Sequence, residues 1–435
     1  MKKKVLATVL SLAVVLGNLA GCSSNQESPS TQSGNSSAAD TEQTSGPAEQ
    51  ISLEVWVRDS YYDLLSKAAA QYMEKTPNVK IEVVQPENVS DQLALALSSG
   101  ETPDIVSMDC VLVPYFSSIG ALADMTDKVN SLPYKEAFSG GLMDLAKYQD
   151  KTYAVPFAPD VSVLLYNKDH FKEAGLNPDQ PPKSWSELTS YAQKLTTNDH
   201  YGYVYGAADA GTMMFTFVPY IWSNGGDVLT EDGQQSTLNQ PKAVEALQYI
   251  SDLESKYKVV PQGITSYGWT EAEDAFKTQS ASMIVLGSAA VYSMVSNSEV
   301  DFGVGTALIP AADGKNFSSF SGGDSLTVMK DCKNQDAAWN FIQYLLSEDV
   351  QVEELAKNGS LPARSDLFDN EYFNNHPEYE VMKEALMVGK APYSLHYNEM
   401  YAPFLDGVQA AINNTMPAKE ALDNATANIN SVLSQ

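Results

Sequence analysis

Cysteine and histidine are scarce in this sequence, with 3 and 4 of them among 435 residues. Three cysteines are too few for a scaffold held together by disulfides. The histidines are scattered, with no His-x-x-x-His pair, and there is no Cys-x-x-Cys motif, so a transition-metal site is unsupported. We expect Cys110 and Cys332 to be small buried residues, with a disulfide between them as the alternative.

Basic residues are also few, because 27 Lys and Arg stand against 55 Asp and Glu, a net charge of −28. A surface this acidic repels phosphate backbones, so we expect no nucleic-acid partner. The charge alone leaves three classes open: an enzyme for cationic substrates, a calcium binder, or a very soluble carrier.

The common enzyme motifs are missing as well. There is no glycine-rich phosphate loop, no Gly-x-Gly-x-x-Gly and no Gly-x-Ser-x-Gly elbow. Residues 227–232 look like a loop but lack the ligand spacing of a calcium hand. A pair of carboxylates that cleaves glycosides is not excluded, yet nothing in the sequence singles one out. We therefore expect no catalytic residue, no metal and no cofactor.

Long apolar runs are confined to the N-terminus. Three lysines precede the short apolar run 5–16, which is typical of a signal peptide, so residues 1–21 are predicted to be one. No later apolar run reaches 18 residues, so no membrane-spanning helix is expected in the body.

The end of this signal, Leu19-Ala20-Gly21-Cys22, resembles a bacterial lipobox. The resemblance implies cleavage before Cys22 and diacylglycerol on its sulfur, which anchors a protein stably on a membrane. The alternative is a plain secretory signal with an incidental cysteine. Residues 22–50 are rich in Ser, Gln, Thr, Asn and Gly, and we expect them to form a disordered tether to an extracellular body.

The body begins with alternating strand and helix patterns. Residues 51–57, 79–84 and 105–108 read as strands, and helical spacing connects them over 61–73 and 93–97. This order is typical of a mainly parallel sheet with helices on both faces.

The pattern continues toward the C-terminus. Ser184 and Glu187 have capping-box spacing, Pro241 suits a first helical turn, and Asp336 is predicted to cap a helix. Further strands are predicted at 161–166, 282–286 and 326–329, and further helical stripes at 401–412 and 422–429.

Residues 156–173 contain the run Leu164-Leu165-Tyr166-Asn167-Lys168 and closely resemble family 1 extracellular solute-binding proteins, the receptors of ABC-type sugar importers. The resemblance covers roughly residues 50–435. Other matches keep the family's order: 103–105, 120–124, 153–156, 173–176, 182–185, 224–226, 243–247, 276, 281–283, 321–323, 337–341 and 361–364.

The resemblance implies an α/β fold of type II, like that of periplasmic binding proteins, with two lobes that close over a ligand. Three crossings are implied near 156–160, 320–324 and 360–364. One lobe then comprises 51–159 and 322–360, and the other comprises 160–321 and 361–435. In open parallel sheets, ligands bind at the carboxyl ends of strands, and clefts between lobes are favoured sites.

A saccharide needs carboxylates, amides or arginine for its hydroxyls and flat aromatic rings for its faces. Asp160 is the leading polar candidate, because it lies at the first implied crossing, where relatives often use an acid. A solvated hinge acid is the alternative. The other predicted ligand-binding residues lie at strand ends, before Asn224-Gly225-Gly226, at the implied crossings or at helix starts: Trp56, Arg58, Asp59, Asp109, Phe215, Trp222, Trp269, Gly322, Gly323, Asp324 and Tyr401. We expect Arg364 to pin the third crossing.

One motif departs from the family. Many relatives carry Gly, a variable residue and then Trp where this sequence has Gly287-Ser288-Ala289. That stacking platform is absent, with Trp269 or Trp222 as candidates to replace it.

The resemblance predicts a monomeric, lipid-anchored receptor that delivers a mono- or oligosaccharide to the permease of an ABC importer. Alternatives are a receptor of the same fold for a polyamine, an amino-acid derivative or glycerol phosphate, a sensor that presents its ligand to a kinase, and a surface glycoside hydrolase. A phosphate compound would need a basic cleft, and few of the candidate positions are basic.

Overall fold

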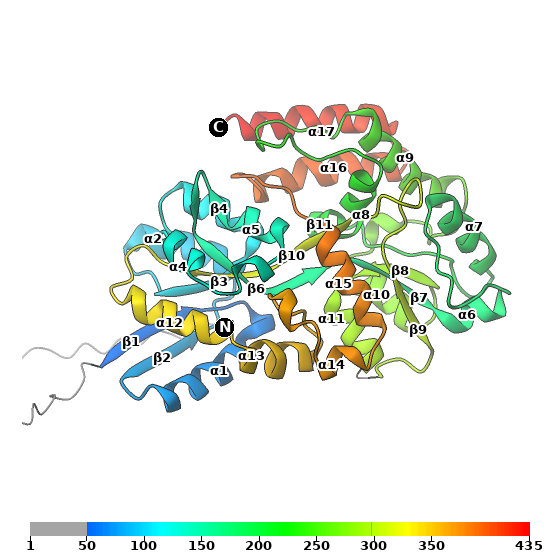
Figure 1. Cartoon of the computed structure of the whole chain (residues 1–435). Coiled ribbons are helices and arrows are strands. Elements are labelled where there is room, and N and C mark those ends of the chain that lie inside the picture. Colours follow the sequence, from blue (N-terminus) through cyan, green and yellow to red (C-terminus); the bar gives the residue numbers. More distant parts are fainter. Residues whose placement is uncertain (1–49, 297) are drawn as a thin grey trace, which may run out of the picture. The chain divides into compact units, whose positions relative to one another are not determined.

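The computed structural model describes residues 50–296 and 298–435 (Figure 1). The predicted signal peptide, Cys22 and nearly all of the tether lie outside the described residues. The strands are β1 Ile51–Trp56, β2 Val79–Val84, β3 Ile105–Asp109, β4 Lys147–Tyr148, β5 Lys151–Thr152, β6 Ala154–Val161, β7 Val163–Asn167, β8 Met283–Leu286, β9 Val304–Ala307, β10 Ser319–Val328 and β11 Gly389–Lys390.

Helices cover these strands. They are α1 Tyr62–Lys75, α2 Val89–Ser99, α3 Val113–Ser118, α4 Thr126–Asn130, α5 Gly140–Leu145, α6 Lys168–Glu173, α7 Trp185–Leu195, α8 Ala210–Ser223, α9 Pro241–Ser255, α10 Trp269–Lys277, α11 Ser288–Val291, α12 Gln335–Leu345, α13 Glu348–Val350, α14 Glu371–Asn374, α15 Glu378–Val388, α16 Tyr401–Ile412 and α17 Ala418–Leu433.

The larger sheet has the strand order β11-β10-β3-β1-β2, and β6 also pairs with β10. The predicted parallel arrangement is confirmed for β1, which lies parallel to both β2 and β3. β10 is antiparallel to β3 and to β6, so the sheet is mixed. β10 begins seven residues before the strand predicted at 326–329, because its first half pairs with the end of β6.

Besides the separate pair β4-β5 there is a second main sheet, called the smaller sheet below, which is antiparallel and has the order β8-β7-β9. The prediction of one strand over 161–166 is wrong, because Val161 ends β6 and Val163 begins β7. Ser162 between them bonds β10: its N–H donates to Phe320 O at 3.1 Å, and its hydroxyl accepts Phe320 N–H at 2.8 Å. The chain therefore passes from one sheet to the other at this serine.

The larger sheet has apolar cores on both faces. Val55 and Ile105 belong to one buried cluster, which includes α1 and α12, while the next residues, Trp56 and Val106, belong to another with Leu93 of α2. Successive side chains of a strand point to opposite faces, so the two clusters flank the sheet. A third and larger cluster surrounds the smaller sheet and α8, α9, α16 and α17. The exact lobe boundaries stay a prediction.

Two helix starts agree with the sequence and one does not. Ser184 and Glu187 form the expected capping box at α7, and Pro241 occupies the first turn of α9. The prediction that Asp336 caps α12 is wrong: the cap position is Asn334, and Asp336 lies within the helix and pairs with Lys128 at 2.6 Å. An acid is favourable there too, because it faces the positive end of the helix dipole.

Close backbone packing joins β6 and β10. Gly323 has φ +104°, and a Cβ atom there would lie 2.1 Å from the carbonyl oxygen of Ala158. Only glycine fits this position without strain. The buried amide of Gln351 donates to Phe157 O at 3.2 Å and accepts from Ala363 N at 2.7 Å. Gln351 therefore ties β6 to the segment around Ala363.

Cys110 and Cys332 are both buried and unpaired, so the alternative of a disulfide is wrong. No helix within residues 50–296 and 298–435 is long and apolar enough to cross a membrane.

Candidate ligand-binding cavity

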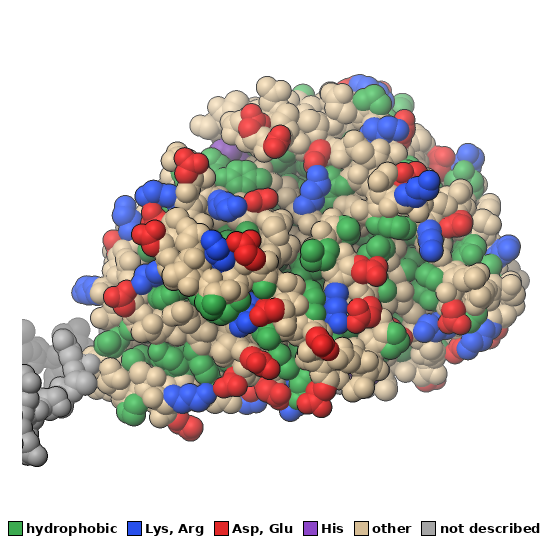
Figure 2. Space-filling model, in the orientation of Figure 1, with side chains coloured by type: hydrophobic (Ala, Val, Ile, Leu, Met, Phe, Trp, Pro, Cys, Tyr) green, Lys and Arg blue, Asp and Glu red, His purple; other side chains and the backbone are tan. Residues whose placement is uncertain are grey.

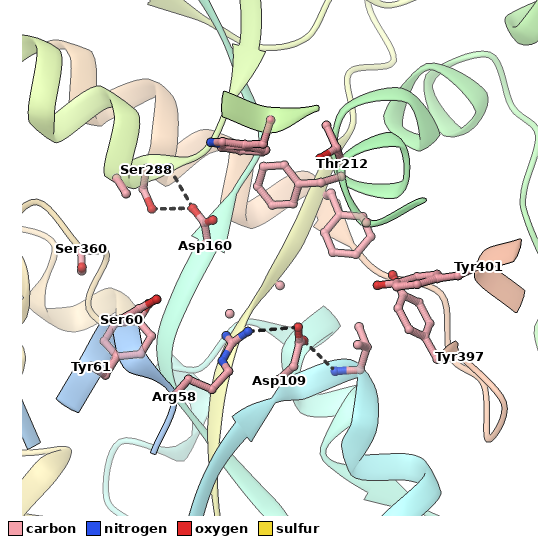
Figure 3. Close-up of a pocket in the computed structure, with 18 residues that line it drawn as sticks. Arg58, Ser60, Tyr61, Asp109, Asp160, Thr212, Ser288, Ser360, Tyr397 and Tyr401 are labelled. Atoms are coloured by element: carbon pink, nitrogen blue, oxygen red, sulfur yellow. Dashed lines mark hydrogen bonds and ion pairs between the residues drawn. The ribbon is translucent and has the colours of Figure 1, made fainter. Parts of the chain in front are cut away.

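A cavity of about 430 Å³ lies where β1, β3, β6 and β10 meet α8, α10, α11 and α16 (Figure 3). Its size suits a small organic ligand. Its lining comprises Arg58, Ser60, Tyr61, Asp109, Val111, Asp160, Gly211, Thr212, Phe215, Trp269, Ser288, Ala289, Phe320, Gly322, Gly323, Ser360, Tyr397 and Tyr401.

Arg58 follows β1 and is held by two carboxylates. Its Nη1 lies 3.4 Å from Asp109 Oδ2, and its Nη2 bonds Asp324 Oδ1. Asp324 lies on β10 beside Asp109 of β3 and is fully buried, and its other oxygen accepts the hydroxyl of Ser107 at 2.8 Å. Burial opposes the charge on Arg58, but the attraction of Asp324 and Asp109 outweighs it and raises the pKa of the arginine. Arg58 is thus fixed before any ligand arrives.

Asp109 ends β3 and faces Arg58 across the cavity floor (Figure 3). Its carboxylate also accepts the N–H of Val111 at 3.3 Å, which caps the short helical turn that follows. Burial raises the pKa of Asp109, although Arg58 acts in the opposite direction. With 37% of its side chain exposed, Asp109 can accept hydrogen bonds from a ligand.

Asp160, near the end of β6, caps α11. One of its oxygens accepts the N–H of Ser288 at 2.8 Å, the Ser288 hydroxyl at 2.5 Å and the N–H of Val161 at 2.9 Å. A Cβ atom at Gly287 would lie 2.7 Å from the other oxygen, so glycine lets α11 approach this carboxylate. Burial raises the pKa of Asp160, and the bonds from Ser288 oppose that rise.

Aromatic rings form the opposite wall. Phe215 of α8 packs edge-on against Trp269 at 5.8 Å between ring centroids, and lies 5.4 Å from Phe320. Trp269 begins α10 and donates its indole N–H to Glu273 at 3.0 Å. Edge-to-face pairs of this kind hold rings in place. The wall offers flat apolar area to a ligand.

Two tyrosines extend this wall at the start of α16. Tyr397 and Tyr401 pack edge-on at 5.3 Å, and burial raises the pKa of Tyr401 to about 12. Both hydroxyls are therefore neutral near pH 7. Across the cavity, Tyr61 packs edge-on against Phe157 at 6.0 Å.

Eight of the twelve residues predicted to bind ligand line the cavity together: Arg58, Asp109, Asp160, Phe215, Trp269, Gly322, Gly323 and Tyr401. Their roles with a ligand stay predictions. Arg364 does not line the cavity; it stacks on Tyr134 and bonds Asp366.

Four predicted residues lie outside the lining. Asp324 is buried behind Arg58, as described above. Trp56 packs against the core that contains α2 and α3, and the exposed Asp59 accepts a bond from Gln85. Trp222 lies behind the wall, 6.1 Å from the ring of Phe320, and donates its indole N–H to Asp227 at 2.7 Å. The structure places none of them on the cavity surface.

Sequence reasoning missed ten residues of the lining. Ser288 and Ala289 follow β8, so the strand-end rule that selected Asp109 could have found them. Tyr61 was assigned to a helical stripe but lies in the turn before α1. Phe320 and Ser360 stand at the second and third implied crossings, which could have marked them. No signal marks the others: Ser60, Val111, Gly211, Thr212 and Tyr397.

The cavity pairs carboxylates, hydroxyls and one arginine with aromatic rings. Within the described part of the chain, no three His, Cys, Asp or Glu side chains are grouped so as to hold a metal ion. The side chains present can accept and donate hydrogen bonds and stack on apolar surfaces, which is the chemistry of reversible binding.

Residues 58–352 match the family described as bacterial extracellular solute-binding protein. Among curated proteins, the chain is 25% identical to the diacetylchitobiose-binding protein of Streptomyces coelicolor, with 85% of this chain and 84% of that protein covered. It is 27% identical to the sn-glycerol-3-phosphate-binding periplasmic protein of Yersinia pestis, with 68% and 69% covered.

A solved structure from Thermotoga lettingae is also similar. It is an ABC-transporter solute-binding protein bound to α-D-tagatose, with a TM-score of 0.77, 26% identity and coverage of 88% of this chain and 100% of that one. The likeness confirms the predicted two-lobed α/β fold of type II.

Proposed function

This chain belongs to the family of bacterial extracellular solute-binding proteins, and from that premise we propose that it captures a mono- or oligosaccharide for an ABC importer. The observation that carries the proposal is the division of the cavity into a polar floor and an aromatic wall. Asp109 and Asp160 suit the rim of hydroxyls on a sugar, and Phe215 and Trp269 suit its C–H faces.

The relatives support this ligand class. The proteins from Streptomyces coelicolor and Thermotoga lettingae bind diacetylchitobiose and α-D-tagatose, and they share most of their length with this chain. In the proposed cycle, the ligand shifts the protein toward a closed form, which then docks on the permease. The proposed lobes, 51–159 with 322–360 and 160–321 with 361–435, close by bending at the crossings.

The proposed location is the outer surface of the cell membrane, with lipid on Cys22 and residues 22–50 as tether. Growth with radiolabelled palmitate tests the anchor: wild type should carry the label, and Cys22→Ser should not.

Thermal unfolding tests the ligand class. The purified chain is melted alone and with a panel of saccharides, polyamines and amino acids. A ligand at 100 times its dissociation constant adds about 2.7 kcal/mol to the free energy of unfolding, which raises the midpoint visibly. A saccharide should raise it and be recovered unchanged. A rise with a polyamine and with no saccharide would overturn the sugar assignment, and hydrolysis of the saccharide would show an enzyme.

A receptor for an amine-bearing solute of another class is the second candidate. It is favoured by the two carboxylates that line the cavity beside a single arginine.

A further inference from the structure

The charged groups of the cavity do not balance. Among the described residues that line it, Arg58 carries the only positive charge, whereas Asp109 and Asp160 are both acids. Asp324 adds a third carboxylate directly behind Arg58. Three acids therefore surround one base in a space where water screens charges less than it does in bulk solvent.

The arginine has no free edge for an anion. A guanidinium binds a carboxylate or phosphate best through two parallel N–H bonds from one edge. In Arg58, Nη2 is bound to Asp324, Nη1 lies 3.4 Å from Asp109, and Nε is buried without a partner among the described residues. An anionic ligand would have to displace a carboxylate before it could form a paired contact.

The two acids that hold Arg58 differ in how firmly they are fixed. Asp324 is fully buried and bonded to Ser107, whereas 37% of the Asp109 side chain is exposed. Asp109 is thus the acid that a ligand meets. Asp160 carries its charge into the same cavity from β6 (Figure 3).

From this arrangement we infer that the cavity selects against anionic ligands, and that Asp109 is the residue that determines this selection. Neutral saccharides bind, saccharides that carry an ammonium group bind at least as well, and sugar acids or sugar phosphates are rejected. The inference rests on the proposed function and narrows its ligand class. It separates this chain from its Yersinia pestis relative, which binds sn-glycerol-3-phosphate.

The experiment uses matched sets of probes on the whole protein. Each set holds one neutral sugar, its amino sugar and its uronic acid, built on glucose, galactose and mannose, and spermidine and inorganic sulfate are added as simple ions. Binding is measured by calorimetry and by the unfolding midpoint. In wild type we expect the acid of any bound set to bind on the order of tenfold or more weaker than the neutral sugar.

Asp109→Asn then tests the residue. It keeps an oxygen for the N–H of Val111 but removes one negative charge and frees Nη1 of Arg58. The ratio of neutral-sugar to acid affinity should fall by about tenfold or more. Asp63→Asn is the matched control, because it removes the same charge from an exposed turn of α1 and should leave the ratio unchanged.

The outcomes separate the two proposals. Equal or tighter binding of a sugar acid or sulfate by wild type overturns the charge selection and leaves the saccharide function intact. Binding of spermidine with no sugar overturns the saccharide function and supports the charge selection. If no probe binds wild type or Asp109→Asn, both fail. If Asp109→Asn folds and its ratio of neutral-sugar to acid affinity is unchanged, the role of Asp109 is overturned. If that variant does not fold, the order in which wild type binds the probes decides whether the cavity selects against anions.

Discussion

The polar floor and the aromatic wall of the cavity are held in place by different kinds of interaction. The floor consists of Arg58, Asp109 and Asp160. Arg58 follows β1, Asp109 ends β3 and Asp160 lies near the end of β6, and each is bound to another protein group. The wall residues Phe215 and Trp269 come from α8 and α10 and are held mainly by contacts between rings. The polar bonds of the floor therefore help to hold the fold together, whereas the rings of the wall mainly provide surface for a ligand.

This difference has an energetic consequence. A buried charge that loses its partner costs stability at once, because the remaining charge is left unpaired. A ring that loses a neighbour forfeits contact area with the ligand and a smaller amount of packing. Changes in the floor should thus register first in the folding of the protein, and changes in the wall first in its affinity.

The largest effect is expected from neutralising Asp324, the buried carboxylate behind the floor. Asp324→Asn removes the charge that Nη2 of Arg58 bonds and should lower the free energy of unfolding by about 3 kcal/mol or more, measured by denaturant titration. Asp331→Asn, exposed in the turn just after β10, is the control and should change it by less than about 0.5 kcal/mol. A small loss for Asp324→Asn would show that the pair of Arg58 and Asp324 does not stabilise the fold.

The second-largest effect is expected from Asp160, which caps α11. Asp160→Asn replaces a charged acceptor of three bonds within the protein and should lower the free energy of unfolding by about 1.5–3 kcal/mol, measured by denaturant titration. The control is Asp313→Asn, an exposed acid that accepts backbone N–H bonds in a loop away from the cavity. An unchanged free energy of unfolding in Asp160→Asn would show that this cap does not hold the floor in place.

The wall should give a smaller effect that is confined to affinity. Trp269→Ala removes the ring that packs against Phe215 and should cost about 1–1.5 kcal/mol of binding to any saccharide. Trp185→Ala is the matched control: Trp185 stacks on Tyr249 at 4.5 Å outside the cavity, so its loss should affect stability and spare affinity. The reverse pattern would contradict the distinction between floor and wall.

The smallest effect concerns pH. Burial raises the pKa of Asp109, so the folded state holds this proton more tightly than the unfolded chain does. Its contribution to stability is full below the ordinary aspartate pKa of about 3.9 and is lost as the pH rises through the raised pKa. The free energy of unfolding of Asp109→Asn minus that of wild type should therefore be more positive at pH 7 than at pH 3.5. We expect a difference below about 1 kcal/mol, because the side chain is 37% exposed to screening water.

The floor could be predicted from the sequence much better than the wall. Arg58 and Asp109 stand at or beside the ends of strands that the sequence pattern predicts, and such ends meet at one edge of a sheet. Asp160 is predicted from the first crossing that the family resemblance implies. Asp324 is predicted from the second implied crossing but lies behind the cavity surface. Its burial depends on pairing with Asp109 across β3 and β10, which no local pattern reveals.

Whether an aromatic residue belongs to the wall depends on where along its helix it stands. Phe215 and Trp222 lie seven residues apart on α8, and both are aromatic residues of one apolar helix. Phe215 reaches the cavity, while Trp222 packs behind Phe320. Seven residues make about two helical turns, so both side chains lie on nearly the same face of α8 and differ in their position along its axis. Helical periodicity therefore cannot distinguish them.

The position of Trp222 also makes its intrinsic fluorescence a reporter of the cavity. Its indole stacks on the ring of Phe320, which lines the cavity, and the ammonium group of Lys390 lies over the indole at 5.1 Å from the ring centre. A ligand that shifts Phe320 must alter the surroundings of this indole without touching it. The intrinsic emission of Trp222 can thus report occupancy with no dye attached, and Trp222 should be kept when other tryptophans are replaced.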